Sequence, residues 1–287
     1  EDLRAIRVSG PDLYQIDQYE RTVVMPDLSD GSSYAVDIFR VVGGTDHAKF
    51  MHSHFGTLTT TGLKLEPDEE YGFHALMRDF QTDRAPALGW SAEWKVEDRF
   101  GYLESEKDIR LRCTDLTSDA EASTAEAWVA MSTASNEEAW IPRTMVRRQS
   151  ADAPLASTFV GVIEPYEGAS EIASIRRLGL TTESGEAFPD TYVAVEVKLK
   201  DGRTDLIMAA DVENPQGLKP NLEDAGALVQ PDWGVRLEGE LCVVRRDASG
   251  KVASAAIWNG QRLSVGETGL EAGDGPDFVE AAYNGDQ

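Results

Sequence analysis

Residues 34–56 read YAVDIFRVVGGTDHAKFMHSHFG, and this stretch decides our expectation of the fold. Its first part, residues 34–42, is rich in β-branched and aromatic residues, and apolar side chains fall on both faces of an extended strand. A strand that is apolar on both faces is typical of one lying between two layers. Gly43 and Gly44 then interrupt the strand and allow backbone dihedrals that other residues resist. We therefore expect a strand, a double-glycine bend and a second strand that carries histidines.

Other segments of the chain show the same β character. Short apolar or alternating runs predict strands at 20–27, ended by Pro26, and at 109–116, 125–131, 158–164, 191–199, 204–209, 235–245, 252–258 and 262–265. The dipeptides Asp201-Gly202 and Asn259-Gly260 are typical of connections between strands. Residues 57–104 are predicted to be rich in loops. For residues 120–127 the pattern leaves a short helix open as an alternative.

Strands this many and this short predict an all-β protein. We expect an antiparallel β-sandwich of stacked sheets, with a second, smaller antiparallel β unit. The sandwich is assigned to residues 1–172 and the smaller meander to residues 173–265. Residues 266–287 form an acidic tail that we expect to be frayed or loosely docked.

The charge of the chain limits its partners. The 287 residues include 51 acidic and 27 basic side chains, which gives a formal net charge of −24. Since affinity for nucleic acid comes mainly from cationic contacts with phosphate, this charge argues against a nucleic-acid partner, and equally against an anionic membrane surface. No run approaches the roughly 18 consecutive apolar residues of a membrane-spanning helix. A local basic groove is still compatible with an acidic polysaccharide.

Three of the four histidines lie within the opening stretch: His47, His52 and His54. On a strand His52 and His54 point to the same face, so they could converge on a sugar, with His47 nearby through the bend. Same-face polar residues on an exposed strand are also commonly solvated surface. The same pair could hold zinc together with His47 or His74, as a two-ligand unit on a strand often does. His74 otherwise reads as an ordinary half-buried histidine.

Arg40 is the cation of the opening strand. It could bind a substrate carboxylate bidentately, or pair with Asp37 or Asp46 at the end of the sheet. The tryptophans could stack on sugar rings, although core packing is their usual role. We expect Trp140 and Trp233 to be exposed and Trp90 and Trp94 to be packed beneath a covering segment.

The two cysteines, Cys113 and Cys242, lie in apolar segments. Their spacing leaves open whether they are buried free thiols or form one disulfide. The sequence begins at Glu1 without a charged-then-apolar leader, so we expect that any secretion signal was removed or was never present.

Four stretches together resemble the β-sheet region of heparinase II/III-like polysaccharide lyases. The segment DIFRVVGGTDH fits a pattern D-x-F-R-V-x-G-G-x-x-H, and His54-Phe55-Gly56 follows it closely, where the family has F-H-G. Weaker matches are TFVGVIEPYEG at 158–168, KDGRTDLI at 200–207 and LCVVRRDASGKVASAAIWNG at 241–260. They occur in the family's order and span most of the chain.

The resemblance implies a periplasmic or extracellular lyase that cleaves uronic-acid-containing glycans, such as glycosaminoglycan or alginate, by β-elimination. It implies that an α/α toroid with the catalytic tyrosine precedes the β part. We therefore expect His52 and His54 as catalytic candidates, and His47, His52, His54 and Arg40 as substrate contacts. The family's metal-ligand context is missing, so no metal or other cofactor is expected, with a structural zinc as the alternative. The second hypothesis is a non-catalytic carbohydrate-binding or structural β module.

Overall fold

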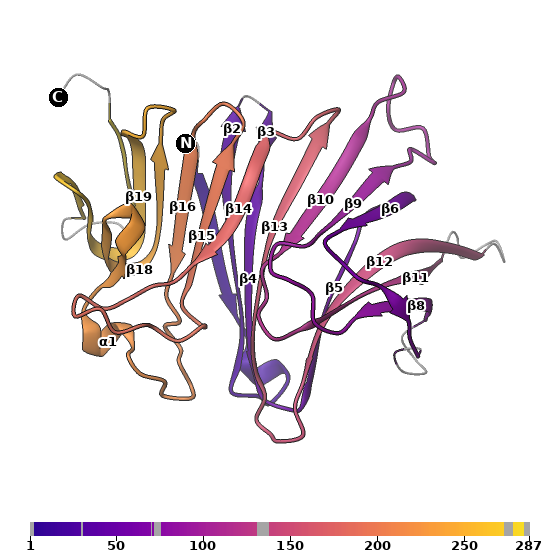
Figure 1. The fold of residues 1–287 in the computed structure, drawn as a ribbon, viewed down its shortest axis with the longest axis horizontal. Helices are drawn as coiled ribbons and strands as arrows, with labels where there is room; N and C mark the ends of the chain where they lie inside the picture. Colours follow the sequence, from indigo (N-terminus) through magenta and orange to yellow (C-terminus); the bar gives the residue numbers. More distant parts are fainter. Residues whose placement is uncertain are drawn as a thin grey trace. The chain divides into compact units, whose positions relative to one another are not determined.

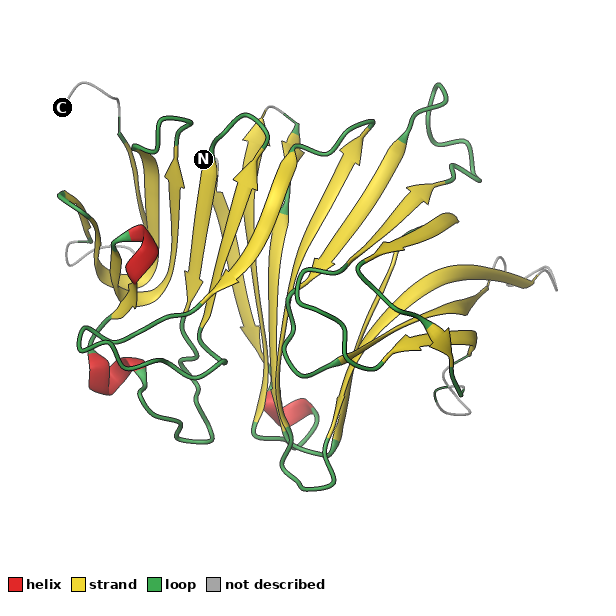
Figure 2. Cartoon of the chain, viewed as in Figure 1, coloured by secondary structure: helices red, strands yellow, loops and turns green. Residues whose placement is uncertain are grey.

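The computed structural model describes residues 3–29, 31–69, 71, 76–130, 138–272 and 278–283, and it confirms an all-β fold (Figures 1 and 2). The chain divides into two compact units, Glu1–Ser170 and Glu171–Gln287. This division falls two residues before the expected boundary. No helix in the described ranges is long and apolar enough to cross a membrane.

The first sheet of the first unit holds the opening strand near its middle. Its order is β1 (Leu3–Ser9), β2 (Gln18–Ser29), β4 (Ala35–Val42), β13 (Ala156–Glu167), β10 (Ile109–Asp115), β9 (Ser91–Val96) and β6 (Gly56–Thr61), and β3 (Ser32–Ser33) pairs with β2. All these pairs are antiparallel. A short 3₁₀ turn, η1 (Pro11–Leu13), connects β1 to β2.

The second sheet of this unit has the order β5 (Asp46–His52), β12 (Glu138–Gln149), β11 (Glu121–Ala130), β8 (Met77–Asp83) and β7 (Glu66–Pro67). Apolar side chains of both sheets form a common core, with Trp94 and Phe159 from the first sheet and Ala122 and Val146 from the second. The two sheets therefore make the expected sandwich. Trp90 and Trp94 are buried, as predicted.

The second unit is built around one antiparallel sheet. Its order is β14 (Ile172–Leu178), β15 (Val193–Leu199), β16 (Thr204–Ala209), β18 (Val235–Arg246), β19 (Val252–Val265) and β20 (Thr268–Glu271); β17 (Leu228–Gln230) pairs with β18, and β21 (Phe278–Ala282) pairs with β19. The short helix α1 (Leu222–Ala225) and the 3₁₀ turn η2 (Pro231–Trp233) lie in the connection between β16 and β18. Leu206, Met208, Leu237 and Cys242 belong to its buried core.

Several local expectations were wrong. Pro26 does not end its strand, because it lies opposite Leu3, where β1 begins and few ladder bonds are required. Asn259-Gly260 is not a hairpin turn but a bulge inside β19, where Gly260 approaches Gly239 so closely that a Cβ on Gly260 would lie 2.8 Å from the Gly239 Cα. The dipeptide therefore allows β19 to approach β18 closely and does not reverse the chain.

Other segments have more strand than expected. The region 57–104 contains β6, β8 and β9 rather than mainly loops, and residues 120–127 belong to β11 rather than to a helix. The described parts of the acidic tail are not frayed, since β20 and β21 both pair with β19. The cysteines are free thiols.

Candidate functional site

The double glycine carries the chain from one sheet of the sandwich to the other. Gly43 and Gly44 have φ angles of +136° and +63°, in the region that favours glycine. A Cβ on Gly43 would lie 2.7 Å from the Cβ of Ile16. The bend therefore ends β4 in the first sheet and starts β5 at the edge of the second sheet.

His47 is buried and links the two sheets through its hydrogen bonds. Its Nδ1 lies 2.8 Å from the Ser157 hydroxyl, and its Nε2 bonds to the Gly43 carbonyl. Burial lowers the pKa of His47, against the opposing effect of the Gly43 carbonyl, so its neutral form is favoured. With both ring nitrogens engaged inside the fold, His47 does not present the substrate contact that the sequence predicted.

His52 and His54 do not form the predicted same-face pair. The strand β5 ends at His52, and His54 lies in the bend before β6. The His54 ring packs against the rings of Phe55 and Phe100, with centroids 5.0 Å and 5.4 Å away. His47 and His52 are five residues apart on β5, so their side chains leave opposite faces of the strand. The three histidines therefore occupy three separate environments.

Arg40 is also placed differently from the prediction. It is buried, and its Nη1 donates to Glu20 Oε1, which lies 2.7 Å away on the neighbouring strand β2. The two expected partners are bonded elsewhere, Asp37 to Arg21 and Lys49, and Asp46 to Arg147. The prediction that Arg40 contacts substrate is therefore wrong, because Arg40 forms a buried ion pair with Glu20 on the neighbouring strand.

A half-buried cationic side chain beside the histidine strand belongs to Arg143. It is the residue directly opposite His52 across the β5–β12 ladder, and its guanidinium lies 5.9 Å from the centre of the Phe50 ring. No described residue gives Arg143 a hydrogen bond or an ion pair, and its Nε is buried without a partner. Burial lowers the pKa of both Arg143 and His52, and Arg143 lowers that of His52 further. The Arg143 cation, the exposed His52 imidazole and the Phe50 ring therefore lie together on one face of the sheet.

The two other arginines near the end of β12, Arg147 and Arg148, already have hydrogen-bond partners within the protein. Arg147 donates to both carboxylate oxygens of Asp46, at 2.9 Å and 2.6 Å, and stacks over Tyr71 at 4.5 Å. Arg148 donates to the carbonyls of Asp119 and Ala156. Within the part of β12 and β5 that the structure describes, Arg143 alone thus keeps its guanidinium for an external anion. No local sequence pattern predicts this role of Arg143, because the register of the β5–β12 pairing places it beside His52.

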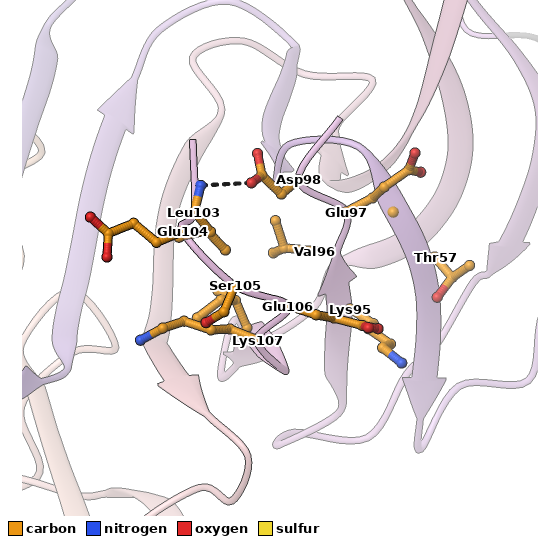
Figure 3. Close-up of a pocket in the computed structure, with 12 residues that line it drawn as sticks. Thr57, Lys95, Val96, Glu97, Asp98, Leu103, Glu104, Ser105, Glu106 and Lys107 are labelled. Atoms are coloured by element: carbon orange, nitrogen blue, oxygen red, sulfur yellow. Dashed lines mark hydrogen bonds between the residues drawn. The ribbon is translucent and has the colours of Figure 1, made fainter. Parts of the chain in front are cut away.

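An open pocket of about 660 Å³ lies at the other end of the histidine segment, by Gly56 (Figure 3). Its lining includes four acidic side chains and two lysines: Glu97, Asp98, Glu104, Glu106, Lys95 and Lys107. The backbone N–H groups of Leu103 and Tyr102 lower the pKa of Asp98, and His54 adds to this effect. This excess of carboxylates would repel a polyanion, so the pocket is unsuited to an acidic glycan.

Neither Trp140 nor Trp233 is exposed as the sequence predicted. Trp233 is buried, and its Nε1 donates to Glu196 Oε2 over 2.8 Å, so it is not the exposed platform that we expected. Trp140 is half-buried beneath the Arg78 guanidinium, which lies 4.0 Å from its ring centre. Trp128, opposite Trp140 in the ladder, is the more exposed of the two.

No cluster of three or more metal-ligating side chains is found among the residues that the structure describes. His74, the alternative zinc ligand, lies outside the described residues. No protein-family model matches the chain, and no curated protein matches it.

Proposed function

We propose that this chain binds a uronate-containing polysaccharide through Arg143 and His52, as the β-sheet part of a polysaccharide lyase. The single observation that carries the proposal is the Arg143 guanidinium, which has no anionic partner among the described residues although the protein has a net charge of −24. The heparinase-like motif pattern supports the assignment to a lyase.

The chemistry of this face suits a sugar carboxylate. The Nη groups of Arg143 can bind a carboxylate bidentately, which a lysine would do only as a point charge. Phe50 provides an apolar wall beside the guanidinium, and His52 can donate a hydrogen bond or gain a proton as an anion approaches. β-Elimination requires that the uronate carboxylate be neutralised before the neighbouring carbon loses its proton. Arg143 would supply that neutralisation.

The base and the acid of the reaction are assigned to another part of the enzyme. His47 is engaged inside the fold, and His52 and His54 lie in different environments, so they form no acid–base pair on this chain. The same facts favour a second candidate, a non-catalytic carbohydrate-binding module. Under that candidate the chain would bind glycan at Arg143 and the larger protein would not cleave it.

The test measures binding of chondroitin, heparin and alginate oligosaccharides by titration calorimetry. Arg143→Gln should weaken binding of at least one of them about tenfold, the loss expected for a charge-assisted hydrogen bond. The matched control is Arg176→Gln, which removes the same charge from an exposed arginine already paired with Glu196. Equal affinities of the wild type and Arg143→Gln would refute the site. Formation of unsaturated uronate by the full-length protein separates the lyase from the binding module.

A further inference from the structure

A second feature of the first unit is a groove of about 510 Å³ that Phe50 helps to line. One wall is the face of the first sheet, as shown by alternate residues of its outer strands: Ile6 and Val8 of β1, and Tyr19, Arg21 and Val23 of β2. Ile6 and Val8 are 61% and 59% exposed. The sheet face at β1 is therefore left uncovered by the second sheet.

The other wall is the edge of a strand. Ala48, Lys49 and Phe50 are consecutive residues of β5, and all three line the groove. Because consecutive side chains of a strand point to opposite faces, one cavity can touch all three only along the edge of that strand. The strand β5 is an edge strand of its sheet, and within the described ranges it pairs only with β12.

The alternation of hydrogen-bonded and non-hydrogen-bonded pairs along the β5–β12 ladder shows which backbone groups of β5 face this edge. The Ser150 N–H donates to the Thr45 carbonyl over 3.0 Å, so these two residues form a hydrogen-bonded pair at the end of the β5–β12 ladder. In an antiparallel pair the bonded positions alternate. The N–H and C=O groups of Ala48 and Phe50 therefore point away from β12 and into the groove.

The groove also has a defined charge. Arg21 and Lys49 both bond to the single carboxylate of Asp37, at 2.7 Å and 2.6 Å, which leaves one positive charge in excess. Around them the lining is aliphatic and aromatic. Aliphatic side chains beside a free row of backbone donors and acceptors suit an extended peptide better than a sugar chain, whose hydroxyls would lie against Ile6 and Val8.

We propose that an extended peptide segment of a protein partner adds to the free edge of β5 as a further strand. Its side chains that face the first sheet would pack on Ile6 and Val8, with an acidic one facing Arg21 and Lys49. The side chains that alternate with them would lie beside Phe50 on the other face of β5. Main-chain hydrogen bonds to Ala48 and Phe50 would supply affinity, as in other cases of strand addition. This interaction is distinct from glycan binding at Arg143, because Arg143 and His52 do not line the groove, although Phe50 borders both sites.

The probe is a blocked, fluorescently labelled peptide of about eight residues, with valines and one glutamate at alternate positions and threonines between them. Its binding to the full chain is measured by fluorescence anisotropy. Ala48→Pro removes an edge N–H that the sheet does not use, and it should lower the affinity about tenfold while the thermal midpoint stays close to that of the wild type. Ile6→Ser should weaken binding several-fold. Leu88→Ser, an exposed leucine outside the groove, is the matched control and should have no effect.

A second arm does not depend on any variant's folding. The same peptide with N-methyl groups on every second amide should lose binding if methylated along the edge that faces β5, and retain it if methylated along the other edge. Equal binding of both methylated peptides would overturn strand addition, as would binding unaffected by Ala48→Pro. Displacement of the peptide by an acidic oligosaccharide would assign the groove to glycan instead. Self-association that Ala48→Pro abolishes, without peptide binding, would assign it to a second copy of the chain.

Discussion

Replacing Asp37 by asparagine should destabilise the first unit strongly. Asp37 lies on β4 in one sheet, and its carboxylate bonds to Lys49 on β5 in the other sheet over 2.6 Å and to Arg21 on β2. The side chain of Asp37 is 1% exposed, that of Lys49 15% and that of Arg21 53%. The substitution keeps the shape of the side chain but leaves the Lys49 ammonium shielded from water without its counter-charge.

The magnitude follows from this burial. Removing one partner of a buried ion pair costs about 3–5 kcal/mol. Arg21 can return to solvent, so the lower end applies and we expect a loss of about 3 kcal/mol. For a unit of this size each kcal/mol lowers the melting midpoint by about 2–4 °C, so the shift should be roughly 6–12 °C. Replacing both residues, Asp37→Asn with Lys49→Met, should recover most of it, because no shielded charge remains.

The assay is scanning calorimetry of the two single variants, the double variant and a control. Glu167→Gln breaks an exposed pair with Lys107 and should change the stability by less than about 1 kcal/mol. Additive effects of Asp37→Asn and Lys49→Met would refute the reasoning, because they would show that the carboxylate and the ammonium do not stabilise one another.

The same pair sets a pH dependence. Burial by itself would raise the pKa of Asp37, but Lys49 and Arg21 outweigh it, so the pKa is lowered. A carboxyl group whose folded pKa lies below its unfolded value of about 3.9 stabilises the fold fully above that value. The contribution is lost as the pH falls through the folded pKa. The stability difference between wild type and Asp37→Asn should thus be constant at neutral pH and shrink below about pH 4.

Three further predictions concern single positions. Gly56→Ala should cost at least about 2 kcal/mol in urea denaturation, because φ is +141° and the new Cβ would lie 2.0 Å from the Lys95 carbonyl oxygen; Gly89→Ala, at φ +86° with open space around it, should cost clearly less. His47→Gln should cost about 1–3 kcal/mol through its bonds to Ser157 and Gly43, yet leave glycan affinity unchanged; a selective loss of affinity would contradict its structural role. Burial raises the pKa of Cys113 and Cys242 to about 12, so neither thiol should react with a disulfide reagent at pH 8 until the protein is denatured, and fast labelling of the native chain would contradict this.

The sequence predicts strands best where the pattern of apolar residues is strong. Residues 204–209 are β16 with the predicted bounds, and residues 193–199 of the predicted strand 191–199 are β15. Both lie within the sheet, buried by their neighbours, so their apolar pattern is clear. The edge strand β1 and the threonine-rich β6 were missed because partly exposed strands carry many polar side chains. Tertiary pairing, rather than local preference, makes them strands.

The candidate site was less predictable than the fold. The sequence placed the histidines on a strand after a double glycine, but the face to which each points depends on which sheet β5 joins. His47 is therefore buried, while His52 is exposed. Arg143 lies opposite His52 only because β12 pairs with β5 in this register, and nothing near His52 in the sequence encodes that. Likewise, Arg40 is compensated by Glu20, a residue on a strand that the local motif does not include.

The most direct test of glycan binding at Arg143 follows the imidazole resonances of the four histidines by NMR during titration with a hexuronate oligosaccharide. We predict that the His52 signals shift and that the pKa of His52 rises on binding, because a nearby carboxylate stabilises the charged imidazole. The His47 signals should stay unchanged, and Arg143→Gln should abolish the response of His52. Saturable binding of the oligosaccharide that leaves the His52 signals and pKa unchanged would contradict the assignment of this face as the glycan site.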